Sequence, residues 1–141
     1  MAGKLIAIEG TDGSGKATQA KLLVERLRKE GKEAALYDFP RYGEPSAYFV
    51  EQYLAGNYPP EMTDAYQASL FYAMDRFEAS IGMREQLEEG TTLVVNRYTA
   101  SNLAHQGGKI EDPTERQRFF AWATGLEFGY LRIPKPSKIL V

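Results

Sequence analysis

Residues 10–18, GTDGSGKAT, have the types and spacing of a phosphate-binding loop. In the pattern G-x-x-x-x-G-K-[ST], glycines let backbone N–H groups turn toward phosphate oxygens, and the lysine neutralises the β- and γ-phosphates. Gly10, Gly15 and Lys16 occupy the required positions. We therefore expect this loop to bind ATP through Gly10, Thr11, Asp12, Gly13, Ser14, Gly15, Lys16, Ala17 and Thr18.

The residues expected to hold Mg²⁺ depart from the usual pattern at two places. Ala17 stands where a hydroxyl usually binds the metal, and one step along a helix turns the Thr18 side chain by about 100°. Asn96 follows an apolar strand where an aspartate is usual. We therefore expect Asp12 to be the main metal ligand, with Glu9 and Asn96 as weaker ligands and water completing the coordination. Bracing of the loop is an equally weighted alternative role for Glu9.

Short apolar runs next to glycine or proline predict the strands that position these residues. The runs lie at 5–8, 34–37, 92–95 and 138–141. Helical periodicity follows the phosphate loop, and Gly31 can end that helix. Strands that alternate with helices indicate an α/β fold with a parallel sheet.

Three further helices are predicted from their boundary residues. A short one covers 47–54, and a long one runs from an N-cap at Thr63 toward Gly90, with a break at Gly82. A third begins at Asp112, where a cap, a proline and an acid come in order.

Composition limits the classes of function. The chain has 141 residues, of which 43% are hydrophobic, so it can bury the core of one domain. Its net charge of −2 disfavours nucleic acid and membrane surfaces as partners. It has no cysteine, which excludes disulfides and thiolate metal sites. No signal peptide or membrane span is present, and a cytoplasmic location is expected.

Several segments together resemble the thymidylate kinases, which make thymidine diphosphate (dTDP) from thymidylate (dTMP) and ATP. In order they are IEGTDGSGK, FPRYG at 39–43, YAMDR at 72–76, NRY at 96–98, ASN at 100–102 and LRIPKP at 131–136. The resemblance implies a parallel sheet flanked by helices, as in P-loop nucleoside-monophosphate kinases. It also implies ATP and Mg²⁺ as cofactors and a homodimer.

The resemblance assigns roles to matching positions. Tyr72 matches the aromatic residue that stacks on thymine, and Arg76 and Asn102 match the groups that read its edge. Arg97 matches the arginine that holds the acceptor phosphate, and His105 stands where a tyrosine is common. The dTMP contacts are then Asp12, Phe39, Pro40, Arg41, Tyr42, Tyr72, Arg76, Arg97, Ser101, Asn102 and His105, and the catalytic residues are Asp12, Lys16 and Arg97.

The phosphate loop lacks the arginine that some thymidylate kinases carry there. The resemblance therefore places the catalytic arginine in a lid that would follow Val141, as would the adenine-binding segment. We expect residues 1–141 to be a single P-loop kinase domain that binds dTMP but turns over poorly alone. Two alternatives stay open: a nucleotide-binding relative with weak or no catalysis, and another nucleoside-monophosphate kinase. The lack of an N-K-x-D motif disfavours a GTPase.

Overall fold

A computed structural model of the chain describes residues 3–10, 13 and 15–141. Their contacts form two compact units. The sheet unit comprises Met1–Phe39, Ala79–Tyr98 and Pro134–Val141, and the helical unit comprises Pro40–Glu78 and Thr99–Ile133. A single kinase domain over residues 1–141 stays a prediction.

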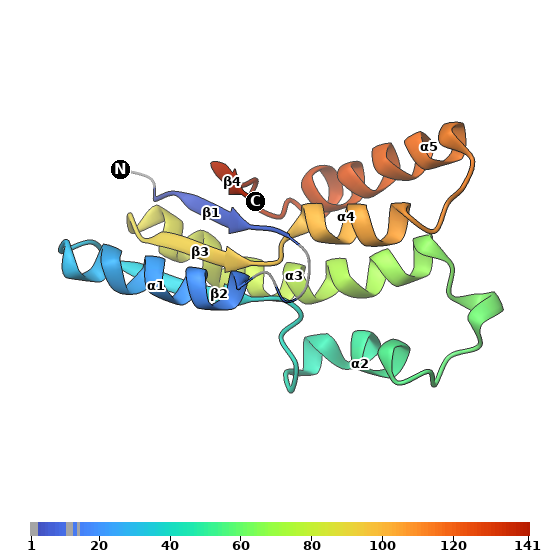
Figure 1. The fold of residues 1–141 in the computed structure, drawn as a ribbon, viewed down its shortest axis with the longest axis horizontal. Coiled ribbons are helices and arrows are strands. Elements are labelled where there is room, and N and C mark those ends of the chain that lie inside the picture. Colours follow the sequence, from blue (N-terminus) through green and yellow to red (C-terminus); the bar gives the residue numbers. More distant parts are fainter. Residues whose placement is uncertain (1–2, 11–12, 14) are drawn as a thin grey trace. The chain divides into compact units, whose positions relative to one another are not determined.

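The sheet unit is built on four parallel strands in the order β2-β3-β1-β4 (Figure 1). The strands are β1 (Leu5–Ile8), β2 (Ala34–Asp38), β3 (Thr92–Asn96) and β4 (Lys138–Leu140). All four predicted strands are confirmed, and β2 and β3 each extend one residue further, to Asp38 and Asn96. Because the strands are parallel, their carboxyl ends share one edge of the sheet, which is where ligands of open α/β sheets bind.

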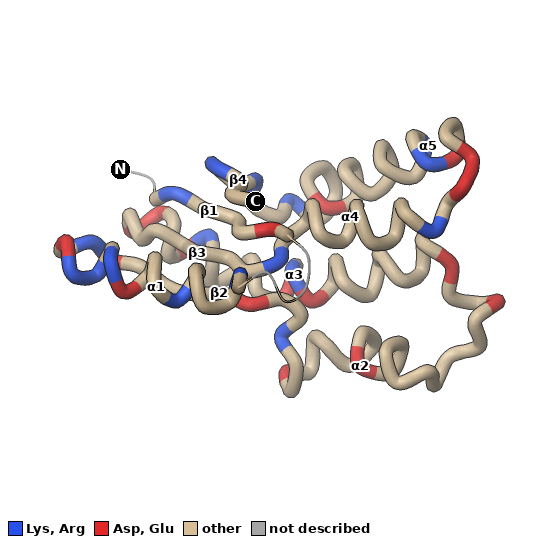
Figure 2. Tube along the Cα trace, viewed as in Figure 1, with Lys and Arg blue, Asp and Glu red and all other residues tan. Residues whose placement is uncertain are grey.

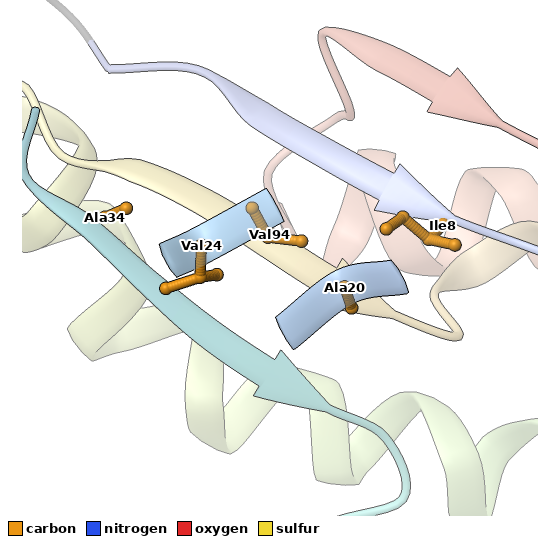
Figure 3. Packing of buried hydrophobic residues seen from close by; sticks show 5 residues of the cluster. All are labelled: Ile8, Ala20, Val24, Ala34 and Val94. Atoms are coloured by element: carbon orange, nitrogen blue, oxygen red, sulfur yellow. The ribbon is translucent and has the colours of Figure 1, made fainter. Parts of the chain in front are cut away.

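Helix α1 (Lys16–Lys29) covers one face of the sheet. Figure 3 shows its contact with the strands, a cluster of the buried side chains of Ile8, Ala20, Val24, Ala34 and Val94. Side chains alternate across a strand, so Asp38 shares the face of Ala34 and Asn96 shares the face of Val94. Both polar residues therefore lie on the face that α1 covers, at the carboxyl edge.

The opposite face of β2 contacts the end of helix α3 (Ala65–Glu88). Tyr37 belongs to that face, and its hydroxyl donates a hydrogen bond to Gln86 Oε1 at 2.6 Å. Helices therefore lie against both faces of the sheet, as the α/β prediction requires.

The helical unit contains the first part of α3 and five short or medium helices. They are α2 (Tyr48–Leu54), α4 (Thr99–Gly107), α5 (Pro113–Thr124) and the 3₁₀ turns Pro45–Ala47 and Pro60–Met62. A π-helical turn, Gly125–Tyr130, follows α5. Ala65, Phe119 and Ala123 form a buried cluster that joins α3 to α5, with Leu103 of α4 packed against it. A Cβ atom at Gly107 would meet the end of the Phe120 ring, which would have to shift, so α4 and α5 pack closely at this glycine.

The boundaries of α3 differ from the prediction. The residue that caps it is Asp64, whose carboxylate accepts from the Tyr66 N–H at 2.8 Å, while Gln67 Oε1 accepts from the Asp64 N–H at 2.9 Å. This is a reciprocal capping box, and the prediction of Thr63 as the cap was wrong. The predicted break at Gly82 was also wrong, since α3 is continuous there. The cap at Asp112 is confirmed by its bond from the Glu115 N–H.

Figure 2 shows that most of the charged residues along α1 are basic, and Glu25 is the one acidic residue within its bounds. The excess of basic side chains on α1 favours an anion near this helix. In the part of the chain that the structure describes, no helix is long and apolar enough to cross a membrane.

Candidate functional site

Between β1 and α1 the structure describes Gly13 and Gly15 of the predicted phosphate-binding loop. Gly13 and Gly15 have φ angles of 78° and 82°, in the left-handed region that glycine enters without strain. Gly15 immediately precedes the helix and contributes no side-chain cap, and the first turn of α1 contains no acidic residue. The N–H groups and dipole of such a helix start favour an anion. The roles predicted for Thr11, Asp12 and Ser14 lie outside the described residues.

Lys16 is the first residue of α1 and is only 8% exposed. Buried lysines are rare unless they pair with an anion or carry a function. Ala17 and Thr18, the next two predicted ATP contacts, differ from Lys16 in that their side chains are exposed. Of these three residues, Lys16 is therefore held most firmly by the fold.

Glu9 is turned toward the end of β3. Glu9 is 7% exposed, and its Oε1 accepts a hydrogen bond from the Tyr98 N–H at 3.0 Å. The Tyr98 hydroxyl in turn donates to the carbonyl of Pro134. These contacts support the bracing role for Glu9, whereas its role as a metal ligand stays a prediction.

Arg97 follows β3 in a strained conformation. Its φ angle is 63°, which costs a residue with a Cβ atom about 1–2 kcal/mol. Its N–H donates to the carbonyl of Ile8 at 3.0 Å, so the end of β1 holds it there. Strained residues of this kind cluster at functional sites, in agreement with a role for Arg97 in binding phosphate.

Asp38 and Asn96 meet at the carboxyl edge of the sheet. They are paired in the register of β2 and β3, and Asn96 Nδ2 donates to Asp38 Oδ1 at 3.2 Å. Asp38 is exposed at the end of the edge strand β2, and partial loss of hydration there raises its pKa above the usual value, while the bond from Asn96 and the charge of Lys16 act in the opposite direction. Asn96 is 5% exposed, and its Oδ1 accepts no hydrogen bond from any residue that the structure describes. Such an oxygen costs about 1–3 kcal/mol unless a ligand or water satisfies it.

The helical unit fixes the segment after β2 through Asp75. Asp75 is 1% exposed, and its carboxylate accepts hydrogen bonds from the Arg41 N–H at 2.8 Å and from the Ser46 hydroxyl at 2.6 Å. Arg41 also lines a hollow of about 370 Å³ together with Glu44, Pro45, Ser46 and Glu78. The Arg41 backbone is therefore held in place while its side chain borders open space.

The remaining residues of the predicted monophosphate wall differ in exposure. The Phe39 ring is 2% exposed and packs in the sheet unit against Tyr37 and Tyr98, with ring centroids 6.3 and 6.1 Å away. Phe39 thus belongs to the core. Pro40 is half-buried, and Tyr42 is 62% exposed.

Tyr72 and Arg76 lie four residues apart on α3, so they share one side of the helix. Tyr72 is half-buried, and burial, aided by the neighbouring phenols of Tyr42 and Tyr53, raises its pKa to about 12. Arg76 is 2% exposed, and its Nε and Nη2 donate to Glu127 Oε1 in the π-helical turn. This ion pair fixes the guanidinium and does not use its Nη1 donors.

Asn102 is the least satisfied polar side chain of the helical unit. It is 6% exposed, and neither its Nδ2 nor its Oδ1 has a hydrogen-bond partner among the described residues. Ser101 beside it is half-buried. His105 lies one turn further along α4, is exposed and lines a separate hollow of about 330 Å³ with Tyr53 and Tyr58.

Each unit thus gathers part of the predicted site. The sheet unit holds Glu9, Lys16, Asn96 and Arg97, and the helical unit holds Arg41, Tyr72, Arg76 and Asn102. Three acids that contact these residues were missed: Asp38, Asp75 and Glu127. Asp75 could have been identified from the sequence, because it stands directly before Arg76. Over residues 3–10, 13 and 15–141, no three side chains of His, Cys, Asp or Glu gather as a metal site.

Comparison with known proteins identifies the family. The family model described as thymidylate kinase matches residues 8–115. Thymidylate kinases of Mycobacterium tuberculosis and Homo sapiens are each 32% identical to the chain, over 94% and 98% of its length. A solved thymidylate kinase structure from Candida albicans superposes with a TM-score of 0.79, at 28% identity over 99% of the chain.

The chain spans 62% and 59% of the two relatives and 63% of the solved structure. The matched segment includes the phosphate loop from Gly10 onward, the DR residues of α3 and the ASN residues of α4. The sequence motifs, the parallel sheet and these matches all indicate the same family. The chain therefore belongs to the thymidylate kinase family.

Proposed function

We propose that the chain carries the phosphate loop and the acceptor site of an enzyme that transfers the γ-phosphate of ATP to dTMP, giving dTDP. The observation that carries this proposal is the buried amide of Asn102, which has no hydrogen-bond partner among the residues that the structure describes. The pairing edge of thymine has a ring N–H between two carbonyl oxygens. One amide can accept from that N–H and donate to a neighbouring oxygen, so thymine would satisfy both of its unpaired atoms.

Two residues of α3 extend this recognition. Tyr72 is half-buried and has an aromatic ring of the kind that stacks on a base, and the Nη1 donors of Arg76 suit a thymine carbonyl oxygen. Because Glu127 holds the guanidinium rigidly, little side-chain entropy would be lost on binding.

Lys16, Arg41 and Arg97 supply the positive charge that two sets of phosphates require. Lys16 and the N–H groups at the start of α1 suit the β- and γ-phosphates of ATP. Arg97 of the sheet unit, whose backbone N–H donates to Ile8, suits the dTMP phosphate. Arg41 of the helical unit, whose backbone N–H donates to Asp75, is also suited to a phosphate. Arginine binds a phosphate through two parallel N–H donors and so orients it as well as neutralising it.

The transfer needs no general base. A phosphate monoester has a second pKa near 6, so the attacking oxygen of dTMP is mostly deprotonated at pH 7. That oxygen forms a bond to the γ-phosphorus, and the bond from this phosphorus to the β–γ bridging oxygen breaks, releasing ADP with the electron pair. The chain's task is therefore to align the two nucleotides and balance their charge. Mg²⁺, when bound, neutralises charge on the β- and γ-phosphates, and Asn96 Oδ1 is a fitting oxygen ligand for it.

A second copy of the chain is the partner that we propose. Leu70 and Met74 of α3 are 39% and 41% exposed, and Phe77 continues the same side of the helix. An apolar stripe of this kind is typical of a helix that packs against a partner. Sedimentation of the wild type and of M74E tests this: a wild-type dimer that M74E converts to monomer is expected, and a monomeric wild type would contradict it.

Calorimetry of the 141-residue chain with dTMP, dCMP, dGMP and dAMP tests substrate choice. We expect dTMP to bind at least tenfold more tightly than the others, whereas equal binding of all four would overturn the proposal. ADP release in a coupled assay measures transfer separately. We expect it to be slow, because the loop holds no arginine. Selective dTMP binding with no ADP release would indicate a nucleotide-binding relative without catalysis.

A further inference from the structure

The proposed function gives no role to Asp38, although this residue accepts a hydrogen bond from Asn96. Asn96 ends the buried strand β3 and is 5% exposed, yet its Oδ1 has no donor among the described residues. Its Nδ2 donates to Asp38 at 3.2 Å, so the amide is oriented and its oxygen is turned away from that contact. A buried oxygen held in this way points to a bound cation or water.

Asp38 supplies a negative charge where Asn96 has none. The two residues are opposite each other in parallel register, so their backbones are separated by one strand spacing, about 4.8 Å. The bond from Asn96 uses only Oδ1 of Asp38, which leaves Oδ2 outside that contact. Both side chains lie on the face covered by α1, whose first residue is Lys16, and the charge of Lys16 acts on Asp38.

We propose that Asp38 and the Oδ1 of Asn96 hold the divalent cation of the donor nucleotide, so that strand β2 supplies the carboxylate that β3 lacks. This inference rests on the proposed function, which makes that nucleotide ATP. Mg²⁺ suits such a site, because it is usually bound by one or two carboxylates together with water and substrate phosphates.

Asp38→Asn is the central variant, because it removes the charge and keeps the shape and the acceptor for Asn96 Nδ2. Electron paramagnetic resonance of Mn²⁺ with ATP present measures the cation affinity, and calorimetry with EDTA measures binding of ATP without metal. We expect D38N to weaken Mn²⁺ binding by about 10- to 100-fold, and to leave metal-free ATP binding within about twofold. Glu33→Gln removes an exposed charge just before β2 and is the matched control, with no effect on Mn²⁺.

The swapped variant D38N/N96D returns the carboxylate to β3 and is expected to restore Mn²⁺ affinity to within about threefold of the wild type. N96D alone adds a second carboxylate and is expected to tighten Mn²⁺ binding, which provides a test even if D38N does not fold. Unchanged Mn²⁺ affinity in D38N and N96D would overturn the inference. If the wild type binds no ATP even with EDTA, the proposed function fails instead. In that case, the Mn²⁺ affinity of the same variants is measured without ATP. A tenfold lower Mn²⁺ affinity in D38N supports the cation site, and an unchanged affinity overturns it.

Discussion

Arg76 and Glu127, 51 positions apart in the chain, form an ion pair whose side chains are only 3% and 2% exposed. The pair joins α3 to the π-helical turn after α5. Removing one partner of a buried ion pair destabilises the fold far more than replacing both partners with apolar residues. The reason is that the remaining charge stays buried without an opposite charge.

Glu127→Gln is therefore expected to lower the free energy of unfolding by about 3 kcal/mol or more and to weaken dTMP binding by releasing Arg76. Urea denaturation and calorimetry measure the two effects. The double variant R76M/E127M serves as the control: it should regain most of the stability and still fail to select dTMP. A neutral effect of E127Q on both measurements would contradict the role assigned to this pair.

Asn102→Leu is expected to separate stability from binding. The substitution replaces an unsatisfied buried amide with an apolar group of similar size, so the free energy of unfolding should stay equal or rise by about 1–3 kcal/mol. Affinity for dTMP should fall at least tenfold. A large loss of stability would show instead that Asn102 is satisfied within the fold.

The left-handed backbone of Arg97 predicts different stabilities for two substitutions that remove its side chain. Arg97→Gly and Arg97→Ala both remove the guanidinium and should weaken dTMP binding equally. Glycine adopts a φ of 63° without strain, so R97G should be more stable than R97A by about 1 kcal/mol. Thermal melts of the two proteins provide the measurement. Equal stability would mean that the backbone relaxes when the side chain is lost.

The raised pKa of Tyr72 predicts a loss of stability at high pH. Below the ordinary tyrosine pKa of 10, residue 72 is protonated in both the folded and the unfolded states. Between pH 10 and about 12 the unfolded state ionises first, so the folded state loses stability as the pH rises. Urea denaturation at pH 9 and pH 11 should show a larger loss in the wild type than in Tyr72→Phe. Parallel losses would contradict the shift.

The capping box of α3 leads to a paired test on adjacent residues. Asp64→Ala removes the carboxylate that accepts from the Tyr66 N–H and should lower the free energy of unfolding by about 1 kcal/mol. Thr63→Ala loses only the exposed bond from its hydroxyl to the Pro59 carbonyl at 3.2 Å and should change stability much less. Reversed effects in chemical denaturation would restore Thr63 as the cap.

Local signals explain what the sequence predicted correctly. The strand 5–8 is an apolar run ending at glycines, and the α5 cap is a three-residue pattern around Asp112, so each can be recognised within a few positions. Thr63 and Asp64 show the limit of such signals. Both residue types cap helices, and the choice depends on where the backbone leaves the 3₁₀ turn Pro60–Met62.

Long-range contacts explain what the sequence missed. Asp38 becomes a site residue only because β2 and β3 align Asp38 with Asn96, 58 positions away. Glu127 lies in an apolar stretch whose π-helical turn brings it to Arg76. The identities of both acids were visible, but their partners depend on register and helix packing, which no local pattern encodes.

Strand β1 pairs with β3 on one side and with β4 on the other, and Ser137 donates its N–H to the Leu5 carbonyl across 132 positions. During translation, β1 therefore leaves the ribosome with an edge that stays open until residues 137–140 emerge, roughly ten seconds later at about 5–20 residues per second. Open strand edges promote aggregation. Nascent chains that stall before residue 137 should thus depend on chaperones more than chains in which β4 has paired with β1.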